Sequence, residues 1–150
     1  MDGKPHITVA AVIEQDRRFL LVEERSGGRA VYNQPAGHLE RGESLLEAVV
    51  RETWEETAWR FQPTALSGIY QWTSPKNQVT YLRFCFIGLC HGHDPRQPLD
   101  SGIIRTCWLA RDEILERAER LRSPLVVRCI DDYRAGKRYP LELYTNIAKI

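Results

Sequence analysis

Three glutamates in the segment SLLEAVVRETWEETAW could bind a metal ion together, because Glu52, Glu55 and Glu56 share one side of a predicted helix. Glu52 and Glu56 are like charges four residues apart, which costs a helix about 0.2–0.5 kcal/mol. Near a helix C-terminus each acid also opposes the macrodipole, at about 0.3–1 kcal/mol when exposed. A divalent cation would relieve this repulsion, and carboxylate oxygens suit Mg²⁺ or Mn²⁺. The alternative is a solvated acidic helix face.

The stretch NQPAGHLERGE, residues 33–43, lies directly before these acids and contains two glycines, a proline and two glutamates. Glycine and proline favour a turn, so we expect a loop here. Ser44 and Glu47 match a capping box, which predicts a helix from about Leu45 to about Thr57. Its predicted core face comprises Leu46, Val50, Thr53, Trp54 and Thr57, whereas the acids continue a second face with Leu45, Ala48 and Val49.

The spacing of these residues resembles the Nudix box, G-x5-E-x7-R-E-U-x-E-E-x-G-U, in which U is aliphatic. The matching positions are Gly37, Glu43, Arg51, Glu52, Glu55 and Glu56. Thr53 and Trp59 replace aliphatic residues, and Ala58 replaces the closing glycine. Alanine after a helix end costs on the order of 1 kcal/mol or forces another exit of the chain. The departures therefore affect the loop after the helix and none of the charged positions.

The segments VYNQPAGHLE, LRF at 82–84, LRSPLV from 121 and GKRYPLE near the end are similar to the bacterial NudJ subfamily. This resemblance implies a Nudix α/β/α sandwich, which is an α+β fold with a mixed β-sheet and a loop–helix–loop motif. It also implies that the Gly37 carbonyl binds metal and that Glu43 pairs with Arg51. Glu52 and Glu56 are the first-choice metal ligands, and Glu55 is either a third ligand or the general base.

Candidate substrate-binding residues lie outside the box. Many Nudix enzymes add an acid from a distant loop; here Gly102 occupies a position where an acid is expected, so Asp100 is the remaining candidate. Arg25 and Arg83 could contact phosphates or form surface ion pairs. Aromatic residues that could stack on a base, or serve only as packing, are Tyr32, Tyr70, Trp72 and Tyr81.

The resemblance implies hydrolysis of phosphoanhydride bonds in nucleoside di- and triphosphates and related small pyrophosphates. Metal ions would neutralise phosphate oxygens and activate water, and a glutamate would accept its proton. The NudJ likeness further implies release of orthophosphate. One alternative is a pyrophosphohydrolase acting on dinucleoside polyphosphates or RNA 5′ ends, to which Arg128, Arg134, Lys137 and Arg138 could contribute. Another is a nucleotide-sensing Nudix domain without catalysis, although all the box acids are present.

The elements that must position these residues follow from the apolar pattern. Strands are expected at 7–13, 18–24, 30–32, 66–72, 79–89 and 103–109, with turns at 15–17, 26–28 and 74–77. Helices are expected at 111–121 and at 124–135, the second with Pro124 near its start and Gly136 just past its end. This order of strands and helices predicts an α+β domain.

Length and composition fit one domain over residues 1–150 of the 150-residue chain. The net charge of +1 provides no strong field for nucleic acid or an anionic membrane. No apolar run reaches the roughly 20 residues that span a bilayer, and the N-terminus lacks a signal-peptide pattern. The four cysteines show no C-x-x-C spacing, and the segment HGHD at 91–94 is expected to be a solvated turn and not a metal site. We therefore expect a monomeric bacterial protein of the cytoplasm that binds a small molecule.

Overall fold

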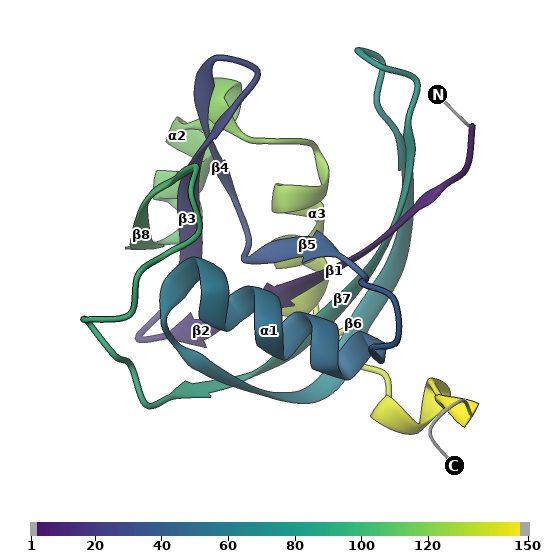
Figure 1. Ribbon diagram of the computed structural model, residues 1–150. Helices are drawn as coiled ribbons and strands as arrows, with labels where there is room; N and C mark the ends of the chain where they lie inside the picture. Colours follow the sequence, from purple (N-terminus) through teal and green to yellow (C-terminus); the bar gives the residue numbers. More distant parts are fainter. Residues whose placement is uncertain (1–2, 148–150) are drawn as a thin grey trace.

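The computed structural model describes residues 3–147, which form an α+β sandwich of two four-stranded sheets flanked by helices (Figure 1). One sheet has the order β5-β1-β7-β6, and the other joins β2, β3 and β4 with β8 paired to β3. The strands are β1 His6–Val12, β2 Glu14–Gln15, β3 Arg18–Ser26, β4 Arg29–Asn33, β5 Ala36–His38, β6 Arg60–Thr73, β7 Thr80–His91 and β8 Ile103–Leu109. The helices are α1 Leu45–Thr57, α2 Arg111–Glu116, α3 Leu125–Arg134 and the 3₁₀ turns η1 Ala118–Arg120 and η2 Leu141–Leu143.

Strand β1 is the centre of the molecule because both of its faces are buried. Ala10 and Val12 belong to a core cluster with Val126 of α3. The alternate residues Val9 and Ala11 belong to a second cluster, which includes Val49 of α1. A strand buried on both faces has a nearly continuous apolar sequence, which explains the run ITVAAVI. The sandwich predicted from the sequence is confirmed, and its two layers of core lie on opposite faces of this strand.

The first sheet is mixed, since β1 runs parallel to β7 and antiparallel to β5. Its register aligns Thr8 with Arg83 of β7 on one side and with His38 of β5 on the other. The β6–β7 hairpin extends beyond the other strands of this sheet (Figure 1), and its last pairs include Trp72 with Tyr81. Because side chains alternate between the faces of a strand, Arg83 and Tyr81 point to the same face.

Several boundaries differ from those expected. The predicted loop at 33–43 contains β5, which pairs with β1 and so satisfies its backbone groups through a distant segment. The predicted helix at 111–121 divides into α2 and η1. Strand β6 begins at Arg60 and continues through Pro63, where the register with β7 shifts. Such an irregularity accommodates a proline, which lacks a backbone donor.

The predicted core face of α1 was partly wrong. Val50 is 37% exposed, and Leu46 and Trp54 are only half-buried. The face that packs on the sheet includes Leu45, Ala48 and Val49, together with Thr53, Glu56 and Thr57. The helix is therefore rotated so that the side bearing Glu52 and Glu56 faces the protein. Among residues 3–147, no helix has the length and apolar character needed to cross a membrane.

Candidate active site

Helix α1 has a defined beginning and end that fix the position of its acids. The Ser44 side chain accepts a hydrogen bond from the Glu47 backbone N–H, and the Glu47 side chain accepts one from the Ser44 backbone N–H. At the other end Ala58 takes a left-handed conformation, with φ of 60°, and donates its N–H to the Trp54 carbonyl. The chain thus makes the turn normally favoured by glycine with an alanine, at an energetic cost.

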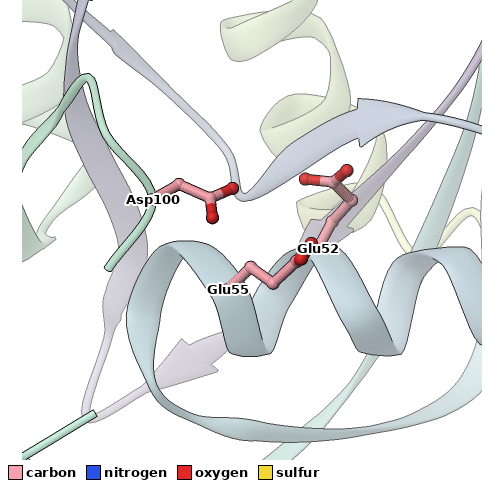
Figure 2. A group of neighbouring side chains, drawn as sticks. All are labelled: Glu52, Glu55 and Asp100. Carbon is pink, nitrogen blue, oxygen red and sulfur yellow. The ribbon is translucent and has the colours of Figure 1, made fainter. Parts of the chain in front are cut away.

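Three carboxylates meet beside α1. Oxygen atoms of Glu52, Glu55 and Asp100 all lie within 4.8 Å of one another. Figure 2 shows that two of these side chains come from α1 and the third from the loop before β8. The Asp100 backbone N–H donates to the Glu55 carbonyl at 2.9 Å, which holds this loop against the helix. The structure therefore brings the distant acid suggested by the sequence to the same place as two box glutamates.

Gly37 lies directly against Glu52. A Cβ atom added at Gly37 would overlap the Glu52 carboxylate, so any larger residue there must displace this group. Gly37 pairs with Val9 of β1, and its strand is therefore held by the sheet. The φ angle of Gly37 is not in the left-handed region, so backbone conformation is not what requires a glycine here. The requirement comes from the close approach of the Glu52 carboxylate to the backbone.

Arg51 connects the acids of the helix to the preceding loop. Its Nε and Nη2 donate to the two oxygens of Glu43, at 3.0 and 2.6 Å. Its Nη1 donates to Glu52 and Glu55, each at 2.8 Å, and its Nη2 also donates to the His38 carbonyl at 3.1 Å. The hydrogen bonds from Arg51 lower the pKa of Glu43, and those carboxylates raise the pKa of Arg51. A planar guanidinium suits this arrangement because it can donate in several fixed directions.

Glu56 differs from the other box glutamates in its surroundings. It is 8% exposed and accepts the Ala36 backbone N–H at 3.0 Å. Burial is the main cause that raises its pKa to about 9, and Glu24, Glu52 and Asp100 add like-charge repulsion. Burial also raises the pKa values of Glu52 and Asp100. A group of acids that disfavours ionisation in this way is stabilised when a cation is bound.

A cleft of about 860 Å³ adjoins the acids. Glu52 and Glu56 line one part, and Trp72 and Tyr81 of the β6–β7 hairpin line another. These two aromatic rings stack with their centroids 6.0 Å apart and an interplanar angle of 22°. Further lining residues are Thr8, Glu24, Asn33, Gly37, His38, Arg83, Arg122 and Leu125. The cleft thus joins a group of hard oxygen donors to an aromatic surface.

Of the remaining substrate-binding candidates from the sequence, some line the cleft and others do not. Arg83 lies in the lining of the cleft and is buried, so it is not a surface ion-pair residue. Arg25 is exposed and does not line the cleft. Tyr32 is 2% exposed, packs in the core and has the guanidinium of Arg120 over its ring. Tyr70 donates its hydroxyl to Asp132 at 2.8 Å, away from the cleft.

Sequence reasoning did not single out Glu24, which lines the cleft and forms an ion pair with Arg122. Burial raises the pKa of Glu24, and Arg122 lowers it in part. Asn33 and Gln34, which lie within the family-like segment VYNQPAGHLE, are also buried polar residues next to the site. A usable signal was present, because Glu23 and Glu24 continue the apolar run FLLV within a single strand.

The residues present fit a divalent metal ion. The three-carboxylate group offers hard oxygen donors, and the neighbouring buried Glu56 can add another. Glycine at position 37 leaves space for the Glu52 carboxylate against the backbone. Such a donor set favours magnesium or manganese over softer metals, which prefer thiolates or imidazoles.

Comparison with known proteins gives consistent results. The NUDIX domain profile matches residues 4–129. Phosphatase NudJ of Escherichia coli strain K12 is 47% identical over 140 residues, which cover 93% of this chain and 90% of the relative. A solved structure of a NUDIX hydrolase from Nitrosomonas europaea is 53% identical, with a TM-score of 0.94 and coverage of 95% of this chain and 97% of that chain. The MutT protein from Methanosarcina mazei Go1, 24% identical with a TM-score of 0.71 and coverage of 91% and 99%, shares the fold. The chain belongs to the NUDIX family and is a hydrolase.

Proposed function

We propose that this hydrolase cleaves the terminal phosphoanhydride bond of nucleoside di- and triphosphates and related small pyrophosphates, with Mg²⁺ or Mn²⁺ as cofactor. The observation that supports this most directly is the position of Glu52, which belongs both to the three-carboxylate group and to the lining of the cleft. The rest of a substrate whose phosphate is held at the acids would therefore extend into the cleft, towards the aromatic pair Trp72 and Tyr81. The similarity to Phosphatase NudJ supports orthophosphate as the product.

The proposed chemistry assigns roles to the chain's own residues. Glu52, Glu56 and the Gly37 carbonyl are the metal ligands we propose, with Asp100 as a further candidate. When bound, the metal supplies charge neutralisation of phosphate oxygens and lowers the pKa of a coordinated water. Glu55 accepts the proton of the attacking water, since its side chain is one of the less buried acids of the group.

Arg51 and Glu43 act on position, not on the reacting atoms. The bidentate pair holds the loop against α1, and the remaining Arg51 donor fixes the carboxylates of Glu52 and Glu55. Fixed carboxylates require less reorganisation when metal and substrate bind, which is how preorganised groups lower a barrier. The aromatic rings of Trp72 and Tyr81 stack on the base or another heteroaromatic group.

The test is a time course of the purified protein with GTP and Mg²⁺, in which GDP, GMP, phosphate and pyrophosphate are measured separately. Transient GDP together with phosphate, without pyrophosphate, supports removal of the terminal phosphate. GMP that forms with equimolar pyrophosphate from the first time point contradicts it. EDTA should abolish turnover in either case, and Mn²⁺ should restore it. The cytoplasmic location and the monomeric state remain predictions.

A further inference from the structure

Arg83 is a buried cation in the lining of the cleft. It is 5% exposed, and among residues 3–147 it forms no ion pair. Its Nη1 donates to the Gln34 side-chain oxygen at 2.9 Å and to the Cys129 sulfur at 3.8 Å. Its Nη2 donates to the Asn33 side-chain oxygen at 3.1 Å. Two neutral amides thus orient the guanidinium, and its positive charge lowers the pKa of the nearby Glu24 carboxyl and of the Cys129 thiol.

The supporting residues are themselves fixed. Gln34 is fully buried and donates its side-chain amide to the Val126 carbonyl of α3 at 2.7 Å. The Arg83 Nε has no hydrogen-bond partner within the described part of the chain, although Arg83 lines the cleft. A guanidinium that lines a cleft and keeps an unused donor is suited to binding a ligand oxyanion. Both the charge and the free donor therefore indicate a ligand oxyanion.

The sheet register places Arg83 between the acids and the aromatic pair. Thr8 of β1 separates Arg83 from His38, the residue after Gly37, so these positions are two strand spacings, about 10 Å, apart. In the other direction Tyr81 lies two residues along the same strand and pairs with Trp72. The Arg83 side chain reaches into the cleft from between these two ends.

We propose that Arg83 binds the phosphate that leaves with the organic group and thereby determines which phosphorus faces the acids. This inference rests on the proposed function. In the reaction, the water oxygen bonds to the terminal phosphorus, and the bond from that phosphorus to the bridging oxygen breaks. The bridging oxygen keeps the electron pair on the departing phosphate, and a carboxylate takes the water proton. Arg83 donates from Nε and Nη2 to that departing phosphate.

A binding experiment without turnover tests the site. GMP and guanosine differ only by the phosphate that would lie on Arg83, and their affinities can be measured in EDTA by titration calorimetry. The native protein should prefer GMP by about 10- to 100-fold, as expected for a charge-assisted hydrogen-bonded pair. Arg83→Gln should reduce this preference to about one. Arg83→Lys should retain part of it, because lysine keeps the charge and lacks the planar fork.

Tyr70→Phe is the matched control, because Tyr70 pairs with Arg83 in the neighbouring strand and loses a hydrogen bond that lies away from the cleft. It should keep the native preference for GMP even where the melting temperature falls. The inference is overturned if the native protein binds GMP and guanosine with equal affinity, or binds neither detectably. It is also overturned if a folded Arg83→Gln or Arg83→Lys variant keeps the full native preference for GMP. The two hypotheses can also fail separately. If the preference for GMP is lost only in the Arg83 variants, but the native protein releases no phosphate from GDP with Mg²⁺, the Arg83 site is supported and the proposed function is contradicted.

Discussion

Replacing Glu56 by glutamine should stabilise the metal-free protein and abolish most of its turnover. The glutamine oxygen can still accept the Ala36 N–H, so the change removes the cost of protonating a buried carboxyl without removing that hydrogen bond. A pKa raised from 4.5 to about 9 means that the folded protein holds a proton that the unfolded chain releases. The stability from this group is complete below pH 4.5 and is lost as the pH rises towards 9.

The magnitude follows from the same linkage. Each pH unit in this window changes the free energy of unfolding by up to about 1.4 kcal/mol, which gives an upper limit of about 4 kcal/mol between pH 5 and pH 8. Relaxation and water entry reduce such values, so we expect about 2 kcal/mol. For a chain of this size that corresponds to about 4–8 °C in melting temperature. The variant should therefore melt close to the native protein at pH 5 and well above it at pH 8.

The assay is thermal unfolding in EDTA at several pH values, followed by the same series with Mg²⁺. Glu55→Gln is the matched control, because it removes the same charge from the adjacent residue, whose side chain is 34% exposed. Glu56→Gln should show the larger change with pH, because Glu56 is the more deeply buried of the two. Mg²⁺ should stabilise the native protein more than Glu56→Gln. Parallel pH profiles of the native protein and Glu56→Gln would refute the reasoning, and near-normal turnover would show that Glu56 is not central to catalysis.

Substitutions at three further positions test other parts of the structure. Gly37→Ala should reduce turnover at least 10-fold with a change in melting temperature of only a few degrees, since the added methyl group displaces the Glu52 carboxylate; unchanged kinetics would show that this carboxylate needs no fixed position. Arg51→Ala should lower the free energy of unfolding by about 3 kcal/mol and should also lower activity. Arg51→Lys should restore both only in part, because lysine cannot donate to Glu43 through two nitrogens. Full rescue by lysine, measured by urea unfolding and by turnover, would mean that charge alone matters. Ala58→Gly should raise the free energy of unfolding by about 0.5–1 kcal/mol, because φ of 60° is strained for alanine; a destabilised variant would mean that the buried methyl group outweighs the strain.

The local part of the site could be predicted from the sequence, and the non-local part could not. Ser44 and Glu47 define the start of α1 within four residues, so the helix was predicted with its observed bounds. Strand β5 was missed because its hydrogen bonds are made to β1, which is distant in the sequence. The face of α1 was misjudged because Glu56, an acid, occupies a buried position that periodicity assigns to apolar residues. Asp100 was suggested by the family resemblance alone, and only the fold shows its carboxylate beside Glu52, so its role stays a prediction.

The central position of β1 also affects how the protein reaches its folded state. This first strand is inserted between β5 and β7, and its partner residues in β7 lie about 75 positions later in the chain. Closing such a long loop costs conformational entropy before any contact compensates for it, so we expect the pairing of β1 with β7 to form late in folding. The strand that braces Gly37 is synthesised early and has to wait for β7 before it is held on both sides. Since Gly37 pairs with Val9 of β1, we expect the backbone beside the acids of α1 to become rigid only when β1 is held by both of its neighbours.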